Sequence, residues 1–264
     1  MAAVAALTGL RTTMGGVNTV LGVRPELWRS IRPDAVPGGI TGFGEPVVGP
    51  DGFTMPATQH DVFVWVSGAS YDLVFDVALS TAGSLAGLAA LAEETAGWLY
   101  HRDLDLTGFI DGTENPTLAE APSVVLVPDG QPGAGGSVLL IQKWGHDSST
   151  RLALSDEEQA QVIGRTKNES VELDDRPITS HAARTDQDDF GKIFRRNTPY
   201  GTVSDHGTMF VGFSAERAHL HTMLESMAGL GGERDALTRY AAPLTGAYYF
   251  VPSADDLAGL AQLT

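Results

Sequence analysis

Residues 108–116 read GFIDGTENP, and they divide a chain of 264 residues into two parts with a similar order of predicted elements. Asp-Gly is a strong turn dipeptide and Asn-Pro marks a boundary, so local chemistry predicts a turn here. Runs of β-branched and aromatic residues predict strands at 18–23, 61–68, 123–130, 136–144, 208–214 and 246–253. Helical patterns lie at 25–31, 80–99, 155–164, 216–232 and 254–263, and the third of these opens with a capping box, Ser155 and Glu158.

The predicted elements run strand, helix, strand, strand, helix, strand about twice, although the sequence itself does not repeat. This order favours an α+β fold with two antiparallel sheets, each covered by helices.

The composition sets limits on the function. Apolar residues make up 42% of the chain and charged residues 19%, as in a soluble globular protein. The formal net charge of −16 argues against nucleic acid or an anionic membrane surface as a partner, because both need a basic footprint. The lack of cysteine excludes disulfides, thiolate metal sites and cysteine nucleophiles. No stretch approaches the ~20 apolar residues of a membrane span, and the first residues lack the pattern of a secretory signal, so the expected location is the cytoplasm.

The segment 165–207 is polar, rich in Asp and Arg, and poor in periodicity, which predicts a long functional loop. It contains RPITSHAARTD (176–186) and IFRRNTPYGT (193–202). Taken singly, His181 is explained as a solvated or hydrogen-bonded histidine. The adjacent Arg195 and Arg196 are likewise explained as two surface arginines that form ion pairs with nearby aspartates.

Several of these segments occur together in one known family. GFIDGTENP, IGRTK (163–167), RPITSHAARTD, IFRRNTPYGT and PLTGAYYFVPS (243–253) stand in the order and approximate spacing found in bacterial dye-decolorizing peroxidases. From about residue 60 onward the chain resembles this family of haem peroxidases.

The resemblance implies two ferredoxin-like repeats with haem b between a sheet and helices. The first repeat would cover residues 1–117 and end in the Asp-Gly segment, and the second would cover 118–264, together forming one compact haem-binding unit. The first strand of the first repeat has no evident counterpart at the start of the chain. Family members are commonly homo-oligomers, which we expect here, and the C-terminal address that directs some of them into encapsulin shells is not evident.

The resemblance also implies roles for individual residues. His181 would be the axial ligand of the iron, with its second ring nitrogen donating to a carboxylate from Asp235 or another acidic residue of 216–240. Asp111 and Arg195 would lie on the opposite face of the haem. Asn197 would orient the peroxide or a water.

Gly112 and Thr113 would contact the cofactor, with Thr113 and Asn115 tying the turn down through side-chain-to-backbone hydrogen bonds. Arg196 is interpreted as structural or as facing a haem propionate.

The chemistry expected from the resemblance is cleavage of hydrogen peroxide to an oxidised iron-oxo haem, which then oxidises dyes or phenolic donors by single-electron steps. Peroxide must lose a proton from one oxygen and gain one on the other, which a carboxylate such as Asp111 can do. Arg195 can stabilise the charge on the leaving oxygen. An arginine beside Asp111 is expected to lower the pKa of this carboxyl group, which predicts an acidic pH optimum.

Two alternatives remain open at this stage. One is a protein that carries or processes haem or porphyrin with little peroxide turnover. The other is a metal-dependent hydrolase built on the acidic clusters at 172–175 and 186–189. Bulky dyes would not enter a narrow pocket, so core packing and electron relay are both open for the four tryptophans, Trp28, Trp65, Trp98 and Trp144.

Overall fold

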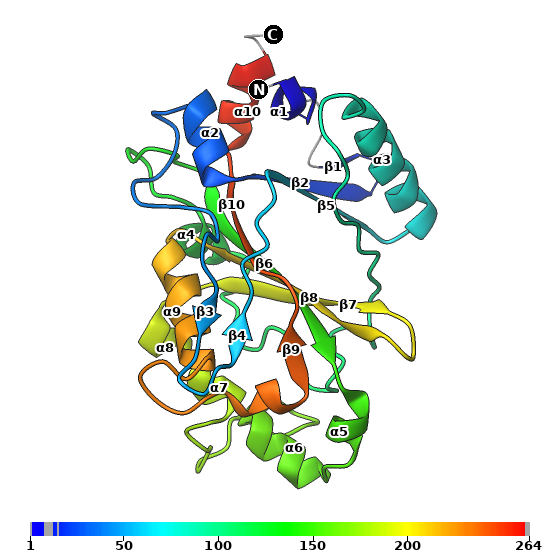
Figure 1. The fold of residues 1–264 in the computed structure, drawn as a ribbon, viewed down its shortest axis with the longest axis vertical. Helices are drawn as coiled ribbons and strands as arrows, with labels where there is room; N and C mark the ends of the chain where they lie inside the picture. The colour runs from blue at the N-terminus through cyan, green and yellow to red at the C-terminus, as the bar shows by residue number, and fades with distance from the viewer. Residues whose placement is uncertain (1, 8–12, 15, 262–264) are drawn as a thin grey trace.

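The computed structural model describes residues 2–7, 13–14 and 16–261 (Figure 1). The strands are β1 Thr13–Met14, β2 Val17–Val23, β3 Val47–Val48, β4 Thr54–Met55, β5 Val62–Gly68, β6 Ser137–His146, β7 Phe194–Gly201, β8 His206–Ser214, β9 Ala241–Pro243 and β10 Ala247–Val251. The α-helices are α1 Ala2–Leu7, α2 Pro25–Ile31, α3 Tyr71–Ser84, α4 Ala121–Val125, α5 Ser148–Leu152, α6 Asp156–Ile163, α7 His181–Arg184, α8 Gln187–Phe190, α9 Arg217–Met227 and α10 Ala254–Ala261. A 3₁₀ turn, η1, spans Ala236–Arg239.

The strands confirm the predicted α+β class with antiparallel pairing. Eight of them form one sheet in the order β1-β2-β10-β6-β8-β7, with β5 paired to β2 and β9 to β6. The strands of the two halves meet where β10 pairs with β2, at Phe250 and Val23. Strands β3 and β4 form a separate two-stranded ribbon.

The central strand β6 separates two apolar clusters. Because successive side chains of a strand point to opposite faces, Val138 and Leu140 belong to the large core, whereas Leu139 and Ile141 belong to a smaller cluster behind the sheet. Helices α7, α8 and α9 and the β3–β4 ribbon lie together on one side of the molecule, where α9 packs against β6 and β8 (Figure 1). Within the described parts of the chain, no helix is both long and apolar enough to cross a membrane.

The predicted helix at 80–99 is wrong in its bounds. The helix in this region, α3, begins at Tyr71 and ends at Ser84. The chain after it forms turns in which Gly87 has a φ of +77°. High helix propensity of Ala and Leu did not suffice, because a glycine in the left-handed conformation ends a helix.

The predicted strand at 123–130 is also wrong. Residues Ala121–Val125 form the short helix α4, with a proline in its first turn, a position that proline favours. The neighbours of β6 in the sheet are β10, β8 and β9, which come from later in the chain.

The segment 165–207 is more ordered than expected, because it contains α7, α8, all of β7 and the start of β8. Helices of four residues are too short to show a period in the sequence. Strand β7, FRRNTPYG, carries polar residues and Pro199, which argue against a central strand. Strand β7 is an edge strand of the sheet, where polar residues and proline are tolerated.

The end of α6 is built as the sequence predicts, and it supports the following functional segment. Ser155 and Glu158 form the predicted capping box, and Gly164 closes the helix with a φ of +89°. A side-chain carbon at Gly164 would lie 2.6 Å from Ser180 Oγ, and Ser180 is the residue that caps α7.

Substitution Gly164→Ala should therefore destabilise the protein by about 2 kcal/mol or more, from backbone strain and from displacement of Ser180. The matched control is Gly231→Ala, because Gly231 also has a positive φ, of +81°, but has open space around it. Gly231→Ala should cost only the strain, about 1 kcal/mol. Chemical denaturation of both variants measures the difference.

Equal losses of stability in Gly164→Ala and Gly231→Ala would contradict a steric contact between the end of α6 and the residue that caps α7.

Candidate functional site

A cavity of about 130 Å³ lies between the sheet and the helices α7 and α9. The strand register determines which residues form the wall of the cavity on the side of the sheet. Leu140, Gly212 and Arg195 stand side by side across β6, β8 and β7, and two residues along the strands Gln142, Phe210 and Asn197 form the next row. All but Gly212 line the cavity.

The helix wall of the cavity is apolar apart from His181 and Thr185. Helix α9 contributes the side chains of Leu220, Met223, Leu224 and Met227. A flat apolar ligand therefore meets hydrocarbon on this side and a mixture of polar groups on the sheet side.

His181 is the first residue of α7 and lines the cavity. Its position is fixed by Ser180, whose hydroxyl accepts a hydrogen bond from the backbone N–H of Ala183. Nδ1 of His181 lies 2.7 Å from Oδ2 of Asp235. Nε2 makes no hydrogen bond to any residue within the described ranges.

Asp235 is the acidic residue of 216–240 that reaches His181. Its side chain is fully buried. One carboxylate oxygen faces the imidazole, and the other accepts from the backbone N–H of Leu237, 2.9 Å away, at the start of η1. This carboxylate is held rigidly and orients the imidazole ring.

Asp111 is held against β7 by Asn197. The backbone N–H of Asn197 donates to Oδ2 at 3.0 Å, and the side-chain amide donates to Oδ1 at 3.2 Å. The side chain of Asp111 is only 4% exposed. The nearest cation is Arg196, with Nη1 3.7 Å from Oδ2.

The prediction that the pKa of Asp111 is lowered is wrong. Burial raises the pKa of this carboxyl group, and the nearby Asp105 adds to the increase. The hydrogen bond from Asn197 and the charges of Arg196 and Arg195 favour the ionised form but do not offset the loss of hydration.

Arg195 lines the same cavity, but it forms no ion pair with Asp111 in the part of the chain that the structure describes. Its guanidinium group donates to Thr185 Oγ1 at 3.4 Å, and Thr185 in turn donates to the carbonyl of His181 at 2.8 Å. Burial lowers the pKa of Arg195, while the charge of Asp111 opposes this change. An arginine side chain stays charged at neutral pH even so.

The turn 111–115 is tied down differently from the prediction. The Asn115 side chain bonds to the backbone of Arg195 rather than to the turn itself. Thr113 is exposed, lines the cavity and makes no side-chain hydrogen bond to a described residue. Gly112, also at the cavity, has a φ of +76°, and a side-chain carbon there would lie 2.5 Å from Asn115 Nδ2.

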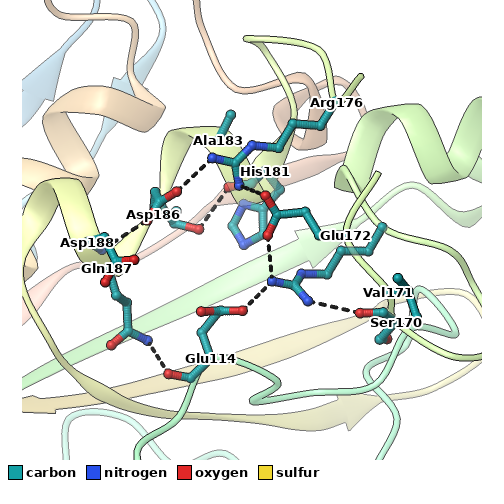
Figure 2. Close-up of polar contacts among 12 residues, drawn as sticks. Glu114, Ser170, Val171, Glu172, Arg176, His181, Ala183, Asp186, Gln187 and Asp188 are labelled. Atoms are coloured by element: carbon teal, nitrogen blue, oxygen red, sulfur yellow. Dashed lines mark hydrogen bonds and ion pairs between the residues drawn. The ribbon is translucent and has the colours of Figure 1, made fainter. Parts of the chain in front are cut away.

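Arg165 is a site residue that no sequence motif indicated individually, although it lies in the segment IGRTK (163–167). It lines the cavity and pairs with Glu114 and with Glu172, the latter at 3.2 Å. Arg176 extends this network to Glu172 and Asp186, as Figure 2 shows. The network joins the turn that carries Asp111 to the segment that carries His181.

The residues of the cavity fit the haem that the resemblance implies. His181 would hold the haem iron through Nε2, which has no hydrogen-bond partner among the described residues. Gln142 is buried and its Nε2 has no hydrogen-bond partner among the described residues, so a polar group of a ligand can satisfy it. A side-chain carbon at Gly212 would lie 2.7 Å from the ring of Phe210 and 3.1 Å from Leu220, so glycine at this position lets these two cavity-lining side chains pack closely against the sheet.

The four tryptophans occupy different environments. Trp28 is fully buried and donates to the Ala35 carbonyl at 2.7 Å, as a core residue does. Trp65 packs against the cluster behind the sheet, Trp98 is 41% exposed, and Trp144 lines the cavity. A role in electron relay stays a prediction for these residues.

Comparisons with known proteins agree with this site. Residues 102–256 match the family model described as Dyp-type peroxidase, C-terminal. The dye-decolorizing peroxidase of Rhodococcus erythropolis (strain PR4) is 36% identical over 260 residues, which cover 94% of this chain and 76% of that protein.

Solved structures show the same likeness. A variant of DypB from Rhodococcus jostii RHA1 in complex with heme superposes with a TM-score of 0.88 at 33% identity, covering 98% of this chain and 90% of that chain. A dye-decolorizing peroxidase from Bacteroides thetaiotaomicron gives a TM-score of 0.90 at 29% identity, with coverage of 98% and 90%.

Proposed function

Because the chain belongs to the dye-decolorizing peroxidase family and is a haem-dependent peroxidase with haem b as its cofactor, we propose specific roles for the residues around its cavity. His181 would bind the haem iron, and Asp111 and Arg195 would act on hydrogen peroxide at the sheet side. The observation that carries this proposal is the arrangement of one cavity. His181 lies in its helix wall and is bonded to the buried Asp235, and Arg195 and Asn197 lie in its sheet wall with Asp111 bound to Asn197.

His181 is prepared for this role by Asp235. With Nδ1 bonded to a buried carboxylate at 2.7 Å, the neutral imidazole carries its proton on Nδ1 and presents a free electron pair on Nε2. The anionic partner also increases the electron donation of the imidazole to a bound metal. When bound, haem supplies the iron that coordinates peroxide and the redox equivalents for donor oxidation.

Asp111 would move the proton. Two of the lone-pair positions of its carboxylate accept hydrogen bonds from Asn197, and the others are left for a peroxide or a water in the cavity. Taking a proton from one peroxide oxygen and returning it to the other leads to water as the leaving group. Asn197 holds the carboxylate in place and reaches the same cavity.

Arg195 would stabilise the negative charge that develops on the leaving oxygen. Its guanidinium group has only one hydrogen-bond partner within the described chain, Thr185, so most of its N–H donors are left for a ligand. At a buried position, a fixed cation acts more strongly than it would at the surface.

The balanced reaction consumes one hydrogen peroxide, two protons and two electrons and yields two waters, with each electron drawn from a separate donor molecule. Dyes and phenolic compounds are the proposed donors.

Gly112 and Thr113 would contact the haem, as their place at the cavity supports. Arg165 would offer its charge to a haem propionate.

We propose that residues 1–117 and 118–264 form two ferredoxin-like halves of one haem-binding unit. The pairing of β2 with β10 supports this, as does the bonding of Asp111 in the first half to Asn197 in the second. We also propose a cytoplasmic homo-oligomer. Apolar side chains at the surface of α3, notably Tyr71, Phe75 and Leu79, supply a surface on which copies can associate.

Replacing Asp111 or Arg195 with alanine should lower kcat/KM for hydrogen peroxide by about 100-fold or more, measured with haem-loaded protein and an aromatic dye as donor. The matched controls are Asp256→Ala and Arg29→Ala, because both residues make polar contacts remote from the cavity. The controls should keep kcat/KM within about twofold. Small and equal losses in the Asp111 and Arg195 variants would contradict the proposed mechanism.

The pH dependence should show the raised pKa of Asp111. The carboxylate is the active form, so the rate of the peroxide step falls as the pH drops through this pKa, which lies above the value of about 4 for an exposed aspartate. The optimum should therefore lie above the pKa of Asp111, and we propose that it lies on the acidic side of neutral. Steady-state rates between pH 3 and 9 test this pH dependence. In Asp111→Asn the rate should no longer fall as the pH drops through the pKa of Asp111. A peak well above pH 8 would rule it out.

Asp235→Asn should raise the reduction potential of the bound haem iron, because a neutral amide replaces the anionic partner of His181. Spectroelectrochemical titration of the haem-loaded variant measures the shift. Asp256→Asn serves as the control, since its carboxylate pairs with Arg32 away from the cavity. An unchanged potential in Asp235→Asn would show that the carboxylate does not act on the iron through His181.

A further inference from the structure

Strand β7 lies at the edge of the sheet. The backbone of Gly97 and Trp98 pairs with the outer side of its second half, whereas the outer side of its first half is covered by side chains instead of another strand. Along this edge the backbone N–H groups of Ile193, Arg195 and Asn197 point away from β8. They donate to Gln187 Oε1 at 2.9 Å, to Asn115 Oδ1 at 2.8 Å and to Asp111 Oδ2 at 3.0 Å. Three side chains thus take the place of a neighbouring strand.

The central contact differs from the other two. Asn115 accepts from the N–H of Arg195 and also donates its Nδ2 to the carbonyl of Arg195, again at 2.8 Å. Its carboxamide pairs with Arg195 as a peptide unit of an adjacent strand would.

Asn115 belongs to the same turn as Asp111. Its backbone N–H donates to the carbonyl of Gly112 at 3.0 Å, which closes the turn between the two residues. The turn therefore binds β7 at two points, at residue 195 through Asn115 and at residue 197 through Asp111. If the first contact is lost, Arg195 can shift relative to Asp111 while the second contact persists.

The side chain of Arg195 has little else to hold it. Within the described residues its guanidinium group has a single hydrogen bond, the long one to Thr185 at 3.4 Å. The direction of the guanidinium group is set mainly by the backbone from which it projects.

We infer that Asn115 is a positioning residue of this peroxidase, which sets the place of Arg195 relative to Asp111 by pairing with the Arg195 backbone. The inference rests on the proposed roles of Asp111 and Arg195. A misplacement of about 1 Å in such a pair can cost about 100-fold in rate.

The first test is Asn115→Ala in haem-loaded protein. The rate constant of the peroxide step should fall about 10- to 100-fold. Fluoride, an anion that binds ferric haem and needs no peroxide chemistry, should bind about tenfold more weakly, because it loses a hydrogen bond from a correctly placed Arg195. The matched control is Gln59→Ala, whose carboxamide accepts from the backbone N–H groups of Phe43 and Tyr248 away from the cavity.

The second test uses Asn115→Asp. As a carboxylate, the new side chain would face the Arg195 carbonyl with an oxygen and repel it. As a neutral acid it presents one O–H donor and one oxygen acceptor, the same pattern as the amide. The charged groups on the elements that meet this position are Asp111, Glu114, Arg165, Asp188, Lys192, Arg195 and Arg196.

In Asn115→Asp, fluoride affinity and the peroxide rate should recover, relative to wild type, as the pH is lowered from 8 to 4. Asn115→Ala should show no such recovery. This readout separates positioning from a loss of stability, because Gln59→Ala should lower the melting temperature without adding a titration.

If wild type binds fluoride tightly, Asn115→Ala binds it weakly and wild type does not consume peroxide, then the positioning role stands and the proposed mechanism fails. Wild-type fluoride affinity and peroxide rate in Asn115→Ala, with only a lower melting temperature, would overturn the positioning role. The positioning role would also be overturned if fluoride affinity and peroxide rate in Asn115→Asp, relative to wild type, did not change with pH.

Discussion

The outer edge of the first half of β7 is the constraint on which the site depends. An edge strand leaves backbone donors that must be satisfied, and here a turn from the first half of the chain supplies the acceptors through Asn115 and Asp111. The same hydrogen bonds that complete the sheet therefore bring a carboxylate and an arginine from distant parts of the sequence to one cavity wall.

Burial shapes the chemistry of this wall in two opposite ways. It raises the pKa of Asp111 and lowers the pKa of Arg195, so each charge is less stable than it would be in water. The fold offsets part of this cost through the two hydrogen bonds of Asn197. In return, both groups are buried, where the low local dielectric strengthens their effect on a reacting oxygen.

Much of the site could be predicted from short motifs, because His181, Asp111, Arg195 and Asn197 lie in segments whose spacing resembles one family. The strands at 18–23, 61–68 and 208–214 were also evident from their composition.

Other features depend on contacts between distant residues. Strand β7 is polar and contains a proline, so only its pairing with β8 defines it. The choice of Asp235 among the acidic residues of 216–240 depends on the turn that follows α9, and the pKa of Asp111 depends on burial that no local pattern encodes.

The most direct test of the account is stopped-flow absorbance of the haem-loaded protein mixed with one equivalent of hydrogen peroxide near pH 5. We expect a rapid loss of Soret absorbance, followed by recovery when an aromatic donor is added. A Soret band that barely responds to peroxide would contradict it, and the cavity between His181 and Asp111 would then hold haem for a purpose other than peroxide cleavage.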